Sequence, residues 1–97
     1  MSPWFYILRL WSGGLYCGST RDKTRRYEEH FSGHGCRTTR LDHPTELVYE
    51  EEYPTYKEAF CREQQIKRWS RAKKEALIKG DFVKLRRLSK QKSKMNL

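Results

Sequence analysis

The sequence predicts one small α/β (α+β) domain in which a β-hairpin and a third strand combine with amphipathic helices. Three observations lead to this prediction. The chain has 97 residues, a length typical of a single domain. Its first 18 residues read as two strands joined by a glycine-containing turn. Residues 55–66 carry the pattern of a capped, amphipathic helix.

The composition predicts a thin core. Hydrophobic residues make up 36% of the chain and charged residues 34%. Aromatic residues, at 13%, can carry much of the burial because each ring covers a large area. A domain of this size buries a smaller fraction of its surface than a large one, so we expect modest stability.

The N-terminal hairpin is predicted from residues 4–11, which are rich in aromatic and β-branched side chains, and from the returning strand 15–18. A Ser-Gly-Gly turn joins them, and glycine tolerates the backbone angles of tight turns. With a three-residue loop, Leu10 would face Tyr16, and Tyr6 would project from the same side of the sheet as Tyr16. A two-residue loop would separate the two tyrosines.

A helix is expected next, with Asp22 as its N-cap and its end near Phe31. Arg26 and His30 lie four residues apart on it and therefore share a face. Residues 32–44 are rich in Gly, His, Thr and Arg, and we expect an irregular connection there.

Residues 46–50 predict a third strand, which we expect to end near residues 53–54. The helix that follows begins with a capping box formed by Thr55 and Glu58. Its apolar positions form one arc of the helical wheel: Tyr56, Ala59, Phe60 and Ile66. Glu63 falls in the middle of that arc. Burial of an ionised carboxylate is costly unless a partner pairs with it or a ligand binds it.

The C-terminal part is predicted to hold a helix over residues 71–78, ended or broken by Gly80, and a short helix from Asp81 to Leu88. The remaining residues are Lys-rich and lack periodicity. We therefore expect the domain to span residues 1–88 and a basic disordered tail to follow over residues 89–97.

The basic residues are concentrated at the C-terminal end. Residues 67–97 contain twelve Lys or Arg and two acidic residues, whereas residues 1–66 contain nine basic and ten acidic residues. Such a distribution is typical of a phosphate-binding protein, although a solvated tail, ribosomal RNA or an anionic membrane surface would also suit it. The candidate DNA-binding residues are Lys67, Arg68, Arg71, Lys73 and Lys74.

The cysteines are odd in number and widely spaced, at Cys17, Cys36 and Cys61. This pattern predicts no disulfide framework and favours a cytoplasmic location. The N-terminus lacks a basic leader region, and Arg9 breaks its apolar run, so neither a signal peptide nor a membrane span is expected. A zinc site from His30, His34, Cys36 and His43 is disfavoured because their spacing is not that of paired zinc ligands.

Taken singly, the polar residues of the first helix and strands fit ordinary structural roles. Taken together, their order and spacing resemble the signature of the GIY-YIG nucleases. The matching positions are Tyr6 in Trp-Phe-Tyr, Tyr16 in Tyr-Cys-Gly, Arg26 ten residues later, His30 four residues after that, and Glu63. Only the tyrosines and the glycine of the two triplets match. The resemblance covers residues 4–79, and residues 45–78 resemble the small single-domain YhbQ-like (UPF0213) group.

The resemblance implies a three-stranded antiparallel sheet flanked by helices, and hydrolysis of phosphodiester bonds with one Mg²⁺ or Mn²⁺. It implies Tyr16 as general base, Arg26 as clamp of the scissile phosphate, and Glu63 as the sole direct protein ligand of the metal. Tyr6 and His30 would position water, phosphate or Tyr16. Because a free tyrosine has a pKa of about 10, the site must favour the phenolate or use a metal-water network.

The function expected from these residues is a metal-dependent DNA endonuclease. A lone domain has little surface for reading a duplex groove, so single-stranded, flapped or hairpin DNA is the favoured substrate. Such an endonuclease can also prefer particular DNA sequences. The alternatives are a nucleic-acid-binding protein that keeps the scaffold without catalysis, and an accessory subunit that cleaves only with a protein partner.

Overall fold

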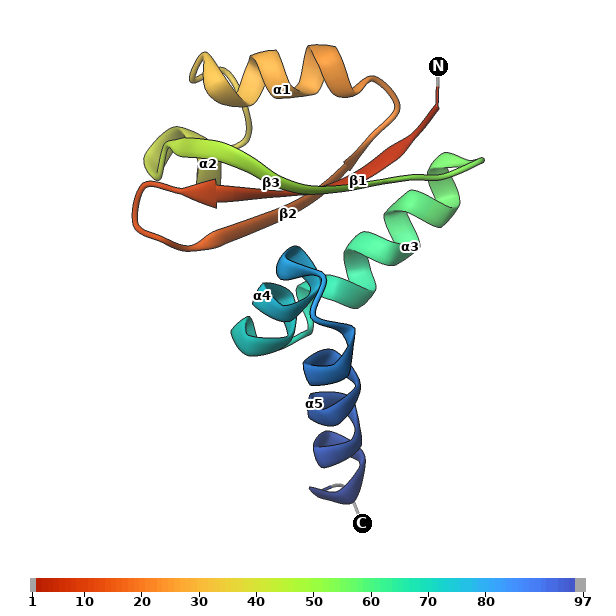
Figure 1. The fold of residues 1–97 in the computed structure, drawn as a ribbon. Coiled ribbons are helices and arrows are strands. Elements are labelled where there is room, and N and C mark those ends of the chain that lie inside the picture. The colour runs from red at the N-terminus through yellow and green to blue at the C-terminus, as the bar shows by residue number, and fades with distance from the viewer. Residues whose placement is uncertain (1, 96–97) are drawn as a thin grey trace. The chain divides into compact units, whose positions relative to one another are not determined.

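The computed structural model in Figure 1 describes residues 2–95 and the side chains of residues 2–90. Contacts between residues divide the chain into two compact units, Met1–Lys67 and Arg68–Leu97, and each is described by itself. The first unit holds β1 (Trp4–Leu10), β2 (Leu15–Thr20), α1 (Lys23–Phe31), α2 (Arg37–Leu41), β3 (Pro44–Glu52) and α3 (Tyr56–Lys67).

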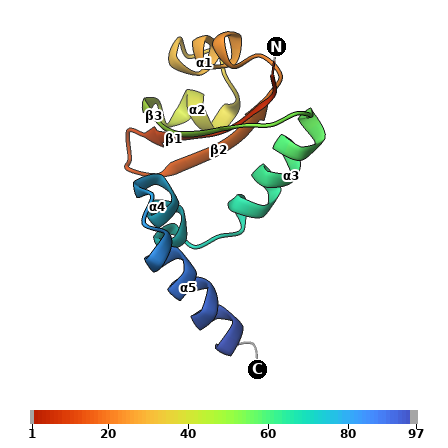
Figure 2. The same ribbon diagram turned by 45° about the vertical axis from the view of Figure 1, so that its right-hand side comes forward.

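The three strands form one antiparallel sheet in the order β2-β1-β3, so β1 is central and β2 is an edge strand. Helix α1 lies on one face of the sheet and α3 on the other, as the two views of Figures 1 and 2 show. The predicted α+β fold, a three-stranded antiparallel sheet flanked by helices, is confirmed.

The hairpin register decides which side chains share a face. The loop closes between Leu10 and Gly14, where the Leu10 N–H donates to the Gly14 carbonyl at 2.9 Å. Leu8 therefore faces Tyr16, whereas the sequence had suggested Leu10 as its partner. The difference is two residues, and an even shift leaves every side chain on the same face. Tyr6 and Tyr16 thus project from one face, as expected.

Both long helices of this unit begin as predicted. The Asp22 side chain accepts a hydrogen bond from the Arg25 N–H at 3.2 Å and caps α1. At the start of α3 the Thr55 hydroxyl accepts from the Glu58 N–H at 3.3 Å, which is half of the predicted capping box. Helix α2 was missed, because five residues are too few to show a helical period.

The core centres on β1, where Phe5, Tyr6, Ile7 and Leu8 are fully buried. On α3 the predicted arc is only partly buried. Ala59 and Ile66 are inaccessible to solvent, but Phe60 is 43% exposed and Tyr56 is only half-buried. The apolar arc is therefore buried at Ala59 and Ile66 and partly open to solvent at its two aromatic residues.

The second unit contains α4 (Arg71–Lys79) and α5 (Phe82–Met95). Gly80 ends α4 in the left-handed conformation, at φ 72°, as predicted for a C-terminal glycine. We expected the last helix to end at Leu88 and a disordered tail to follow. Instead α5 continues to Met95, since Lys, Gln and Met favour helices and neither Gly nor Pro interrupts them. Residues 96–97 of the expected tail lie outside the described residues.

The three cysteines all lie in the described part of the chain and are free. Cys17 is buried, Cys36 is half-buried and Cys61 is exposed. Among the described residues no helix has the length and apolar character needed to cross a lipid bilayer.

The close approach of β1 and β2 explains Gly18. A Cβ atom at this position would lie 2.4 Å from the Tyr6 hydroxyl oxygen. We predict that Gly18→Ala lowers the free energy of unfolding by about 1–3 kcal/mol, because the buried Tyr6 ring must shift. Thermal or urea unfolding measures this. Gly14→Ala, whose Cβ meets no atom closer than 3.3 Å, is the matched control and should cost far less. Equal losses in the two variants would contradict the close packing described here.

Candidate active site

The site is organised by a hydrogen bond between strand β1 and helix α1. The Tyr6 hydroxyl lies 2.8 Å from Nε2 of His30, and both side chains are fully buried. Their rings meet edge to face with centroids 5.7 Å apart. Burial raises the pKa of Tyr6 to about 12, although its hydrogen bond with Arg26 acts in the opposite direction. Tyr6 is therefore a neutral phenol at physiological pH.

The tautomer of His30 follows from its other ring nitrogen. Nδ1 lies 2.9 Å from the hydroxyl of Thr39, a fully buried residue of α2. Because that hydroxyl donates to the Cys36 carbonyl at 3.2 Å, we infer that it accepts from the Nδ1–H of His30. Nε2 then carries no proton and accepts from Tyr6. Burial, followed by the positive charge of Arg26, lowers the pKa of His30 to about 4, and the imidazole is neutral.

Tyr16 lies beside this pair on the same face of the sheet. Its ring centroid is 5.2 Å from that of His30 and 6.4 Å from that of Tyr6. Burial raises the pKa of Tyr16 well above its usual value, and its hydrogen bond to the Cys36 sulfur raises it further. The charge of Arg26 lowers it in part. Formation of the Tyr16 phenolate therefore requires additional positive charge nearby.

The pKa of the Cys36 thiol changes in the opposite direction. Burial alone would raise it, but hydrogen bonds from the Tyr16 hydroxyl and from the backbone of Thr39 outweigh burial and lower the pKa below its usual value. The Cys36 sulfur is thus an acceptor for the Tyr16 hydroxyl. Sequence reasoning assigned no role to Cys36 or Thr39, and no motif at these positions pointed to one.

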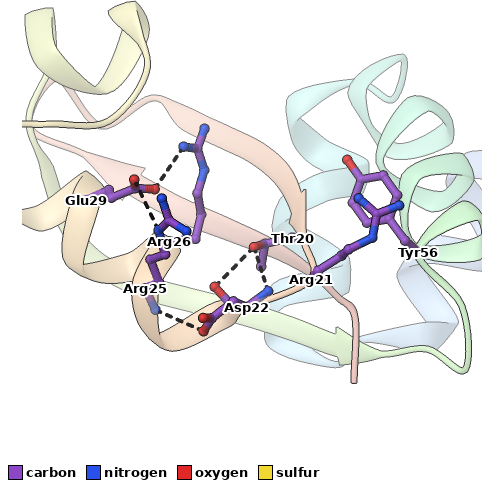
Figure 3. A pocket seen from close by; sticks show the side chains of 7 residues that line it. All are labelled: Thr20, Arg21, Asp22, Arg25, Arg26, Glu29 and Tyr56. Carbon is purple, nitrogen blue, oxygen red and sulfur yellow. Dashed lines mark hydrogen bonds and ion pairs between the residues drawn. The ribbon is translucent and has the colours of Figure 1, made fainter. Parts of the chain in front are cut away.

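Arg26 connects this cluster to solvent. Its guanidinium donates to Glu29 at 3.2 Å and shares a hydrogen bond with Tyr6. Burial would lower the pKa of Arg26, but these partners raise it overall, so the side chain is permanently charged. Arg26 also lines an open cleft of about 390 Å³, shown in Figure 3. The residues around the cleft are Thr20, Arg21, Asp22, Arg25, Arg26, Glu29 and Tyr56.

Glu63 approaches β2 from the opposite face of the sheet. It is 8% exposed, and its Oε1 accepts from the Ser19 hydroxyl at 2.7 Å. Its Oε2 pairs with Lys67 at 2.8 Å and accepts from Gln64 at 3.2 Å. Ser19 follows Gly18 in β2, so its side chain faces α3, whereas Tyr16 faces α1. The near-buried carboxylate anticipated from the helical wheel is therefore paired, as its burial requires.

The donors available to a metal ion are few. Among the described residues no group of three or more His, Cys, Asp or Glu side chains could hold a metal ion. Glu63 offers a single carboxylate, a hard oxygen donor. One carboxylate together with water and phosphate oxygens fits Mg²⁺ or Mn²⁺. Lys67 would have to leave Oε2, and its side chain is half exposed and long enough to do so.

The structure brings four of the five predicted catalytic residues into one cluster on the α1 face of β2, namely Tyr6, Tyr16, Arg26 and His30. The fifth, Glu63, lies on the α3 face and is linked to the same strand through Ser19. The cluster and the carboxylate thus flank the edge strand from two sides. The sequence motif contained all five residues, but only the structure reveals Ser19 as the connection.

The predicted DNA-binding residues occupy different environments. Lys67 pairs with Glu63, and Arg71 pairs with Glu75 at 3.4 Å while 61% of its side chain is exposed. Lys73 is buried, and its ammonium lies 4.3 Å from the centre of the Trp69 ring. Direct phosphate contact is therefore easier for Lys67 and Arg71, and for the exposed Arg68 and half-buried Lys74, than for Lys73.

Comparison with known proteins defines the class. The family model of the GIY-YIG catalytic domain matches residues 2–76, which include the whole sheet and all five predicted catalytic residues. A UPF0213 protein from Staphylococcus aureus strain Mu3 is 42% identical over 78 residues, covering 80% of this chain and 95% of the relative. The chain belongs to the GIY-YIG family and, within it, to the UPF0213 proteins.

Two solution NMR structures share the fold. A UPF0213 protein from Bacillus halodurans has a TM-score of 0.54 and 39% identity, with 81% of this chain and 84% of that chain covered. A protein from E. faecalis has a TM-score of 0.57 and 33% identity, with 86% and 88% covered. The resemblance noted in the sequence is thereby confirmed at the level of family and fold.

The neutral state of His30 predicts acid sensitivity. Its pKa is about 6.5 in an unfolded chain and about 4 in the folded protein, so the unfolded state binds the proton first. Stability should therefore fall as the pH is lowered from 6.5 to 4, by up to about 2–3 kcal/mol. Urea unfolding at several pH values measures this. His30→Gln is the control and should lose that part of the pH dependence, whereas an unchanged profile would refute the assignment.

The Thr39 hydroxyl should matter as an acceptor. Thr39→Val keeps the shape but leaves the buried Nδ1–H of His30 without a partner, which we expect to cost about 1–3 kcal/mol of stability. Thr39→Ser restores the hydroxyl and should recover most of that loss. Thermal unfolding of the two variants side by side gives the comparison. If valine were tolerated as well as serine, the inferred tautomer would be wrong.

Proposed function

We propose that this protein is a metal-dependent endonuclease that hydrolyses phosphodiester bonds in DNA. Family membership supports a nuclease-type activity and a nucleic-acid substrate. The observation that carries the proposal is the arrangement of Tyr6, Tyr16, Arg26 and His30 beside an open cleft, with the Glu63 carboxylate on the other side of the same strand. No purely structural role requires that combination.

The roles follow from the environment of each side chain. Arg26, permanently charged and lining the cleft, would bind the scissile phosphate. Tyr16 would act as general base towards the attacking water, once positive charge at the site favours its phenolate. Tyr6, which donates to neutral His30, would hold its oxygen towards Arg26 and fix the guanidinium.

Glu63 would hold Mg²⁺ or Mn²⁺ after Lys67 has moved aside. A divalent ion bound there supplies Lewis-acid charge, which lowers the pKa of a bound water and neutralises the phosphate. Ser19 would keep the carboxylate in position through its 2.7 Å hydrogen bond. Lys67, released from Glu63, would be free to contact the DNA backbone.

Single-stranded or structured DNA is the proposed substrate, because the small first unit offers little surface for reading a duplex groove. Phosphate contacts and stacking of unpaired bases suffice for such a ligand. The free cysteines fit a reducing compartment, and we propose the cytoplasm as the location.

Cleavage of labelled single-stranded, duplex and hairpin DNA tests the proposal, with Mg²⁺, Mn²⁺ or EDTA present. We predict cutting that requires the metal and falls by at least about 100-fold in Glu63→Gln and in Arg26→Ala. Glu58→Gln is the matched control on the same helix, since glutamine can preserve the capping box, and it should cleave normally.

The outcomes separate the alternatives. Tight, salt-sensitive binding without cutting of any DNA would contradict an autonomous enzyme and indicate a DNA-binding protein on this scaffold. Cutting that appears only after a cell extract is added, and that still needs Glu63, would indicate a nuclease dependent on a protein partner.

A further inference from the structure

An aromatic pair on α3 is left partly exposed next to the proposed site. Tyr56 and Phe60 are one helical turn apart, and their rings stack with centroids 6.2 Å apart and planes 29° from parallel. The Phe60 side chain is 43% exposed, although its position on the apolar arc would have allowed burial. A stacked pair that presents a ring to solvent adds little to the core and offers a flat apolar surface to a ligand.

A cationic side chain completes this surface. The Arg21 guanidinium lies 4.2 Å from the centre of the Tyr56 ring, and both residues line the cleft shown in Figure 3. Arg25 and Arg26 line the same cleft from α1. Three arginines against two carboxylates give the cleft a net positive charge, which suits the phosphates of a polynucleotide.

The aromatic pair is connected to the proposed metal ligand by a single serine. The Ser19 hydroxyl lies 3.5 Å from the Tyr56 hydroxyl and 2.7 Å from Oε1 of Glu63. Arg26 reaches the cleft from the opposite face of the sheet. A strand with one phosphate near Arg26 and Glu63 would therefore have a neighbouring base at Tyr56 and Phe60.

We propose that Phe60, Tyr56 and Arg21 form a stacking subsite for an unpaired nucleobase adjacent to the scissile phosphate. The inference rests on the proposed function, and it deepens it by stating which substrate the site selects. A base in a duplex is covered on both faces by its neighbours, so only a flipped or single-stranded nucleotide can stack there. Aromatic stacking of this kind tolerates any base, since every base has a flat face.

Binding of a fluorescein-labelled oligo-dT strand and of a blunt-ended, fully paired duplex, measured by anisotropy in EDTA, tests the subsite without cleavage. We predict that Phe60→Leu weakens binding of the single strand by about tenfold and changes duplex binding by less than about twofold. Phe60→Trp should restore or strengthen single-strand binding. Phe31→Leu replaces an equally exposed phenylalanine of α1 (37% exposed) and should leave both affinities unchanged.

Binding by Phe60→Leu that matches wild type, or that falls equally for the single strand and the blunt-ended duplex, would overturn the subsite. That result is independent of catalysis. A protein whose metal-dependent cleavage needs Glu63 but whose single-strand affinity ignores Phe60 would refute the subsite and keep the proposed function. A protein that requires Phe60 for single-strand binding yet cleaves no DNA would support the subsite and refute the proposed function.

Discussion

The buried hydrogen bond between the Tyr6 hydroxyl and His30 is the interaction on which the rest of the site depends. It joins the central strand to α1, and through Thr39 it extends to the short helix α2. Because no water reaches these groups, each donor must meet an acceptor inside the protein. This requirement fixes the His30 tautomer, the direction of the Tyr6 proton and the presence of glycine opposite Tyr6.

The edge position of β2 explains how so small a protein can assemble a two-sided site. An edge strand has neighbours on one side only, so residues of both its faces come close to open solvent. Alternation along β2 sends Tyr16 towards α1 and Ser19 towards α3. The tyrosine cluster and the Glu63 carboxylate are thus brought to one strand by pleating alone, without a second domain.

Local patterns in the sequence predicted most of the secondary structure of the first unit. The Ser-Gly-Gly turn, the Asp22 cap and the Thr55 capping box placed the hairpin and both long helices of the first unit, because each is a short-range device. Helix α2 was too short for periodicity, and residues 89–95 of α5 were expected to be disordered because their sequence shows no apolar period. The wheel of α3 located Glu63, but exposure of Phe60 depends on which neighbours the fold supplies.

The partners of the site residues could not be derived from spacing. Thr39 and Cys36 lie in a connection without a motif, and they meet His30 and Tyr16 only through tertiary packing. The Thr39 hydroxyl is assigned as the acceptor for His30 because it donates its proton to the Cys36 carbonyl, and only the three-dimensional structure shows that bond. Motif recognition thus gave the five candidate catalytic residues, whereas their partners Thr39, Cys36 and Ser19 appear only in three dimensions.

The protonation state of His30 is the most direct test of this account, and ¹⁵N NMR of labelled protein observes both ring nitrogens. We predict a neutral ring with the proton on Nδ1 from pH 8 down to about pH 5, and titration only near pH 4. A proton on Nε2, or titration near pH 6.5, would contradict the buried network and the direction assigned to the Tyr6 hydrogen bond.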